Sequence, residues 1–86
     1  MIPYFFKIPL QHYLDVNDIL PIDRPLFKLE LIQGLHYDYI HVGKFAEIHS
    51  KSKQVIQVKT STGAEFIAPI HQFYIEVPFI YDPTLK

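Results

Sequence analysis

The chain has 86 residues, of which 49% are hydrophobic and 15% aromatic, a composition that predicts one small domain with an apolar core and excludes intrinsic disorder. Eight lysine and arginine residues stand against nine acidic residues, and the resulting net charge of −1 excludes the strongly basic surface of a non-specific nucleic-acid binder. No cysteine is present, which excludes disulfides and thiolate metal sites.

Residues 1–25 are predicted to form a proline-rich aromatic arm, because they hold four of the chain's seven prolines. Between Pro9 and Pro21 the apolar residues recur at helical spacing, which predicts one short helical turn. The residues near this spacing are Leu10, Tyr13, Leu14 and Val16. The rest of the arm is expected to be extended and to pack on the following domain or on a neighbouring molecule.

The chain carries no recognisable export or membrane signal. Prolines and Lys7 interrupt the apolar N-terminal stretch, and no small-residue cleavage site follows it. No apolar run approaches the roughly 20 residues that a membrane-spanning helix needs. We therefore expect a cytoplasmic protein without membrane insertion.

From Leu26 onward the hydrophobic period changes to two, which predicts β-strands. The first strand covers 26–32, and a turn at Gln33–Gly34 separates it from a longer second strand that ends near His49. Gly43 lies inside this second strand and predicts a β-bulge or a sharp bend. Its core-facing row is predicted to be Ile40, Val42, Ala46 and Ile48.

Three further strands are predicted after a polar turn at 50–53. They cover residues 54–60, 64–68 and 73–77. Gly63 supplies the positive φ of the tight turn between the first two of them, and Pro69 precedes a 3₁₀ turn at 70–72. Residues Ile56, Val58, Phe66, Phe73, Ile75 and Val77 are expected to be buried.

The order of elements from Gly63 to Ile75 resembles SH3 domains, in which a glycine, an apolar strand, a proline, a one-turn helix and an aromatic–β-branched pair follow one another. Residues 35–39 (LHYDY) are similar to the N-terminal aromatic motif of that family. The resemblance covers residues 26–77 and implies an all-β fold, a small five-stranded SH3-like barrel between the arm and a tail at 78–86. Tryptophan is absent, so the proline-rich peptide ligands that SH3 domains stack on that residue are not implied.

The residues that could perform chemistry do not form a recognisable catalytic or metal-binding pattern. His36 and His41 fall on opposite faces of an extended strand, and His41 and His49 lie about 26 Å apart along it. The serines and threonines fall in turns, where their hydroxyls are expected to hydrogen-bond to the local backbone. The three glycines lie far apart in the sequence, so they cannot form a glycine-rich phosphate-binding loop. We therefore predict no enzymatic activity, no cofactor and no metal site.

Exposed aromatic residues are the strongest functional indication. If the core row points inward, alternate residues on the opposite face point to solvent, and tyrosine is enriched at protein interfaces. The predicted protein-binding residues are Tyr37, Tyr39, His41, Phe45 and Tyr74. The expected partner is a larger protein or a second copy of the chain. The alternative is that the aromatic arm covers this face with Tyr4, Phe5 and Phe6.

A nucleic-acid-binding barrel is the second hypothesis. Its binding residues would be Lys44, Lys51, Lys53 and Lys59. Tyr39 and Phe45 would offer stacking faces beside them. These lysines also have a purely structural explanation, because charged side chains on an edge strand discourage pairing with other chains and so prevent aggregation.

Overall fold

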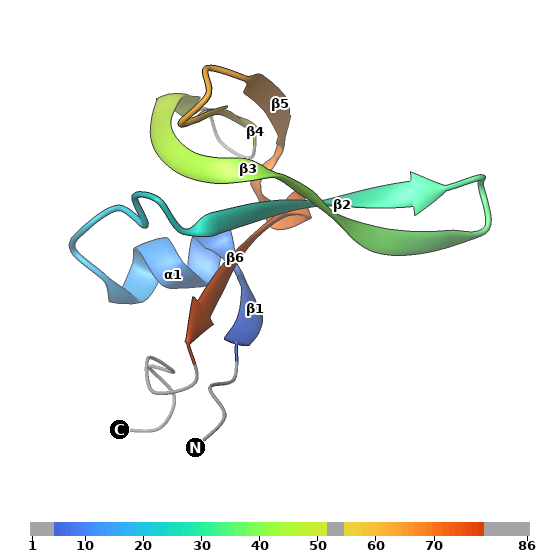
Figure 1. The fold of residues 1–86 in the computed structure, drawn as a ribbon, viewed down its shortest axis with the longest axis horizontal. Helices are drawn as coiled ribbons and strands as arrows, with labels where there is room; N and C mark the ends of the chain where they lie inside the picture. The colour runs from blue at the N-terminus through green and yellow to red at the C-terminus, as the bar shows by residue number, and fades with distance from the viewer. Residues whose placement is uncertain (1–4, 52–54, 79–86) are drawn as a thin grey trace.

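The computed structural model of the chain describes residues 5–51 and 55–78, with residues 50 and 51 described in backbone only. This part of the chain is dominated by antiparallel β-structure (Figure 1), so the predicted all-β class is confirmed. The elements are β1 (Phe5–Pro9), α1 (Leu10–Val16), β2 (Pro25–Ile32), β3 (His36–Lys51), β4 (Val55–Thr60), β5 (Glu65–Pro69), the 3₁₀ turn η1 (Ile70–Gln72) and β6 (Phe73–Pro78). Among these elements, no helix has both the length and the apolar character needed to span a membrane.

The strands form one sheet in the order β1-β6-β2-β3-β4-β5. The five predicted strands correspond to β2 through β6, and a sixth strand, β1, comes from the arm and pairs antiparallel with β6. β1 and β5 are the two edges of this open sheet. The expectation that the arm is extended and packs on the following domain is confirmed for β1, whose Phe6 and Ile8 pack against the core. Its pairing as a sixth strand was not predicted, because prolines surround its short alternation.

The core lies where α1, β6 and the curved part of the sheet meet (Figure 1). The predicted helical turn is confirmed as α1, and its Leu10 and Tyr13 are buried. Phe66 is only partly buried, contrary to expectation, although it packs against this cluster. The buried hydrophobic residues are Leu10, Tyr13, Leu26, Phe45, Ile56, Val58, Ala68, Phe73, Ile75 and Val77.

The bulge predicted at Gly43 is confirmed and redirects β3. Leu26 pairs with Gly43 whereas Phe27 pairs with His41, so Val42 is an extra residue in β3. Gly43 has φ +133°, a conformation that side-chain-bearing residues rarely adopt. Beyond it β3 leaves β2 and pairs with β4 instead. β3 therefore takes part in both halves of the sheet, one formed with β1, β6 and β2 and the other with β4 and β5.

The prediction that Phe45 faces solvent is wrong, because its side chain is fully buried at 0% exposure. The extra residue at Val42 reverses the alternation after it, so Phe45 points inward. Ile40, also predicted to be buried, lies before the bulge on the β2–β3 hairpin and is 39% exposed, whereas Val42 and Ile48 of the predicted core row do pack against the core. The Phe45 backbone is fixed as well, since its N–H donates to Arg24 O at 2.9 Å and its carbonyl accepts from Asp23 N at 2.8 Å.

The outer parts of β2 and β3 extend from the body of the molecule as a two-stranded hairpin (Figure 1). β6 pairs with β2 only along 26–28, and β4 pairs with β3 only from Phe45 onward. The turn at the tip is the predicted one, because Gln33 and Gly34 have φ of +52° and +70° and Leu35 N–H donates to Ile32 O at 2.9 Å. The hairpin presents side chains on both of its faces.

Candidate protein-binding face

One face of the sheet gathers aromatic side chains from three strands and a lysine from a fourth. Cross-strand register places Tyr37 opposite Leu31, Tyr39 opposite Leu29 and His41 opposite Phe27. β6 adds Tyr74, which pairs with Phe27 on its other side, and β1 adds Lys7. We call this surface the tyrosine face, and its members are Lys7, Phe27, Leu29, Leu31, Tyr37, Tyr39, His41 and Tyr74.

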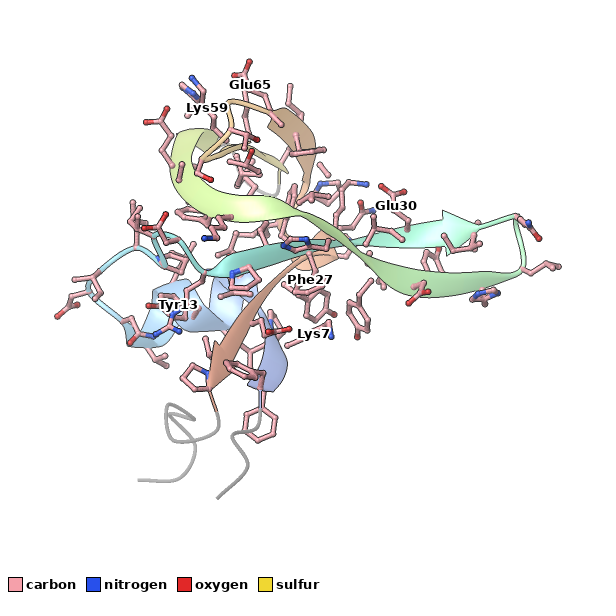
Figure 2. All side chains as sticks on the ribbon, viewed as in Figure 1. Lys7, Tyr13, Phe27, Glu30, Lys59 and Glu65 are labelled. Carbon is pink, nitrogen blue, oxygen red and sulfur yellow. The ribbon has the colours of Figure 1, made fainter. Side chains whose placement is uncertain are left out.

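Ring contacts organise the inner part of the tyrosine face. The Tyr39 and Tyr74 rings meet edge to face with centroids 4.9 Å apart, and the Phe27 and His41 rings are 5.2 Å apart. Figure 2 shows Lys7 directed toward Phe27, and its Nζ lies 4.7 Å from the Phe27 centroid and 5.8 Å from that of Tyr39. Each such contact contributes about 0.5–1.5 kcal/mol. Together they fix the orientation of Tyr39 before any partner arrives.

The outer part of the tyrosine face is open to solvent. Tyr37 is 64% exposed, Leu31 50% and Tyr39 42%. In the described part of the arm, Phe6 packs against the core and Phe5 is exposed, so neither covers Tyr37. Tyr4, which the covering hypothesis also invoked, lies outside the described residues.

The ionisation of Tyr74 is shifted in the folded protein. Burial raises the pKa of its phenol above the ordinary 10.0, and the neighbouring Tyr39 phenol, through charge repulsion and a hydrogen bond, raises that pKa further. The neutral phenol is therefore the form that the folded protein favours.

This shift predicts a loss of stability at alkaline pH. Above pH 10 an unfolded chain releases the Tyr74 proton while the folded chain retains it, so the contribution of Tyr74 is complete below pH 10 and is lost as pH rises through the raised pKa. The melting temperature, followed by circular dichroism between about pH 8 and pH 11, should fall more steeply for the wild type than for Tyr74→Phe. Parallel curves for the two proteins would show that Tyr74 ionises as an ordinary surface phenol.

Four of the five residues predicted to bind protein lie together on the tyrosine face, and Phe45 does not. Sequence reasoning missed Lys7, Phe27, Leu29 and Leu31 as members. The alternation of 26–32 did place the last three on one face, but only the cross-strand register shows that this face continues into the tyrosines.

The predicted lysines do not form a basic surface in the described part of the chain. Lys59 pairs in register with Glu47 on one side and Glu65 on the other, and Figure 2 shows Lys59 and Glu65 together at the far end of the sheet from Lys7. Lys44 is exposed at the bend of β3. Lys53 lies outside the described residues, and Lys51 is described in backbone only.

The same region holds a small acidic cluster. His49 Nε2 lies 3.0 Å from Glu47 Oε1 and 3.8 Å from Glu65 Oε1, and Gln57 donates to Glu65 Oε1 at 2.8 Å. In the part of the chain that the structure covers, no group of three or more histidine and acidic side chains has an arrangement suited to a metal ion. These contacts link polar side chains of β3, β4 and β5 on one surface.

No protein-family model matches this chain, and neither does any curated protein or solved structure.

Proposed function

We propose that the protein is a non-catalytic protein-binding module, an accessory subunit that docks onto a larger protein through the tyrosine face. The observation that carries this proposal is the exposure of Tyr37, Tyr39 and Leu31 in one continuous row on a projecting hairpin. A monomeric surface rarely leaves such apolar side chains side by side unless they meet a partner.

The side-chain contacts within the tyrosine face support the proposal that its ligand is a protein. Tyr39 is held by Tyr74 and Lys7, so little side-chain entropy remains to be lost when a partner binds. Aromatic side chains at the centre of an interface, with polar groups at the rim, are the usual source of binding energy between proteins. Lys7 and its register partner Glu76 place one charge of each sign at the inner end of the face, which favours an apolar partner surface with a polar rim.

We further propose that β2 to β6 form an SH3-like barrel to which β1 is added. The order of the Gly63 turn, β5, Pro69, η1 and β6 supports this assignment, as does the bent β3 that takes part in both halves of the sheet. The proposed docking face then lies on the β6–β2–β3 side of the barrel and its projecting hairpin.

Nucleic acid is the weaker candidate ligand. Phe45 is buried and offers no stacking surface, and Lys59 lies between two carboxylates. A nucleic-acid site needs several unpaired cations along one groove. The described lysines do not supply such a row.

Affinity capture from native cells, with and without nuclease, tests the proposed function. Protein partners should survive nuclease and moderate salt, and the Tyr37→Ala variant should lose them. Ile67→Ala is the matched control, since Ile67 is 66% exposed on β5 and does not belong to the tyrosine face. Loss of all partners after nuclease, or equal capture by the wild type and Tyr37→Ala, would contradict the proposal.

A further inference from the structure

The outer edge of β3 is an unpaired strand edge in the described part of the chain. From His36 to Gly43, β3 pairs with β2 alone. The Tyr39 N–H donates at 2.8 Å to the carboxylate of its own neighbour Asp38, so this N–H points away from β2. Backbone groups alternate in direction along an antiparallel pair, and Tyr37 and His41 therefore present their N–H and C=O groups to the same open edge.

This edge belongs to an element that is weakly supported by the rest of the fold. A two-stranded ribbon is marginally stable on its own, and a third strand with an apolar face is what usually stabilises it. Open edges also act as templates for pairing with another chain. The Asp38 carboxylate accepts a hydrogen bond from the outward N–H of Tyr39, and within residues 5–51 and 55–78 no strand other than β2 pairs with β3 from His36 to Gly43.

We propose that this edge pairs antiparallel with the same edge of a second copy, about a two-fold axis that passes through Tyr39. In this register Tyr39 pairs with its own copy, and Tyr37 of each chain pairs with His41 of the other. In this register the outward N–H and C=O groups of Tyr37, Tyr39 and His41 all find partners in the second copy. No other register pairs all three residues with one another.

The charges along β3 are compatible with the same register. Asp38 of one copy lies opposite Ile40 of the other, and an axis at Asp38 would place two carboxylates directly opposite, which is destabilising. The net charge of −1 per chain adds little repulsion between copies.

Such a dimer would join two tyrosine faces into one continuous surface. Tyr37, Tyr39 and His41 share a sheet face in each copy, and antiparallel pairing about a perpendicular two-fold axis keeps that face on the same side. The inference concerns the edge of β3 and goes beyond the proposed function, which concerns the face. The two proposals can therefore fail separately: a monomeric protein can bind a partner through the tyrosine face, and a dimeric protein can lack such a partner.

Single cysteine variants test the register directly, because the natural chain has no cysteine. In the Tyr39→Cys dimer the two Cα atoms would lie about 5.5 Å apart, within disulfide range. In the Tyr37→Cys dimer they would be about 13 Å apart along the strands, too far for a disulfide. We expect covalent dimers under mild oxidation for Tyr39→Cys and not for Tyr37→Cys, although Tyr37 is the more exposed residue. Equal cross-linking of both would indicate random collision and overturn the proposal.

Sedimentation of proteins that keep Tyr39 gives a second readout that does not depend on the folding of a cysteine variant. The Asp38 carboxylate competes with the partner carbonyl for the Tyr39 N–H, so Asp38→Ala should strengthen dimerisation several-fold over the wild type. Asp18→Ala removes the same charge from an exposed position between α1 and β2 and should leave dimerisation unchanged. A wild type that remains monomeric up to millimolar concentration, or an Asp38→Ala variant that dimerises no more strongly than the wild type, would overturn the proposal.

Discussion

Replacement of Phe45 by alanine is expected to lower the free energy of unfolding by about 3–5 kcal/mol, the range for deleting a buried phenylalanine side chain. Phe45 is fully buried, and its backbone ties the bend of β3 to the loop before β2 through Arg24 and Asp23. The alanine variant would leave a cavity at the junction between the two halves of the sheet. Urea unfolding followed by circular dichroism measures the change.

Phe66→Ala is the matched control for this experiment. It deletes the same side chain from β5, where the ring is only partly buried. Its cost should be clearly smaller than that of Phe45→Ala, because less apolar surface is removed from water in the native protein. Equal costs, or a nearly neutral Phe45→Ala, would contradict the inward orientation of Phe45.

Gly43→Ala is expected to destabilise the protein by at least about 2 kcal/mol, because backbone strain and overcrowding add at this position. The φ of +133° is unfavourable for alanine, and its Cβ would lie 3.0 Å from both Cβ and Cγ2 of Thr60. Thr60 is itself buried and cannot move aside freely. Thermal or urea unfolding of the variant and the wild type measures this loss of stability.

Gly34→Ala measures the cost of a positive φ where there is no crowding. Gly34 also has a positive φ, +70°, but a Cβ there would meet nothing within 4 Å. Only backbone strain applies at the hairpin tip, so the cost should be about 1–2 kcal/mol. If the two alanine variants lost the same stability, the close approach of β4 at Gly43 would have no energetic consequence.

Much of the fold can be predicted from local pattern alone. The period-two alternation locates β2 through β6, Pro69 and the following residues locate η1, and the spacing of Leu10 and Tyr13 locates α1. These signals are local, since each depends on residues within one element. β1 has no clear local strand pattern, because prolines flank its few alternating residues. Its strand conformation depends on pairing with β6, which is distant in the sequence.

The direction of Phe45 could not be predicted in the same way. Gly43 does indicate a bulge, but the alternation has to be counted across it, and one extra residue reverses the side chains up to the next register shift, which lies between Phe45 and Glu47. The tyrosine face was predictable only in part for a related reason. Alternation shows which residues share a face within one strand, whereas the neighbours that complete the face, Lys7 and Phe27, depend on the register between strands.

The Tyr37→Ala variant offers the most direct test of the claim that the tyrosine face is an interface. Its free energy of unfolding and its affinity for a captured partner should be measured on the same preparation. A residue that is 64% exposed should change stability by less than about 1 kcal/mol, while loss of an interface tyrosine should weaken binding at least tenfold. A variant that loses several kcal/mol of stability while its folded fraction binds the partner as tightly as the wild type would show that this face supports the fold and not an interface.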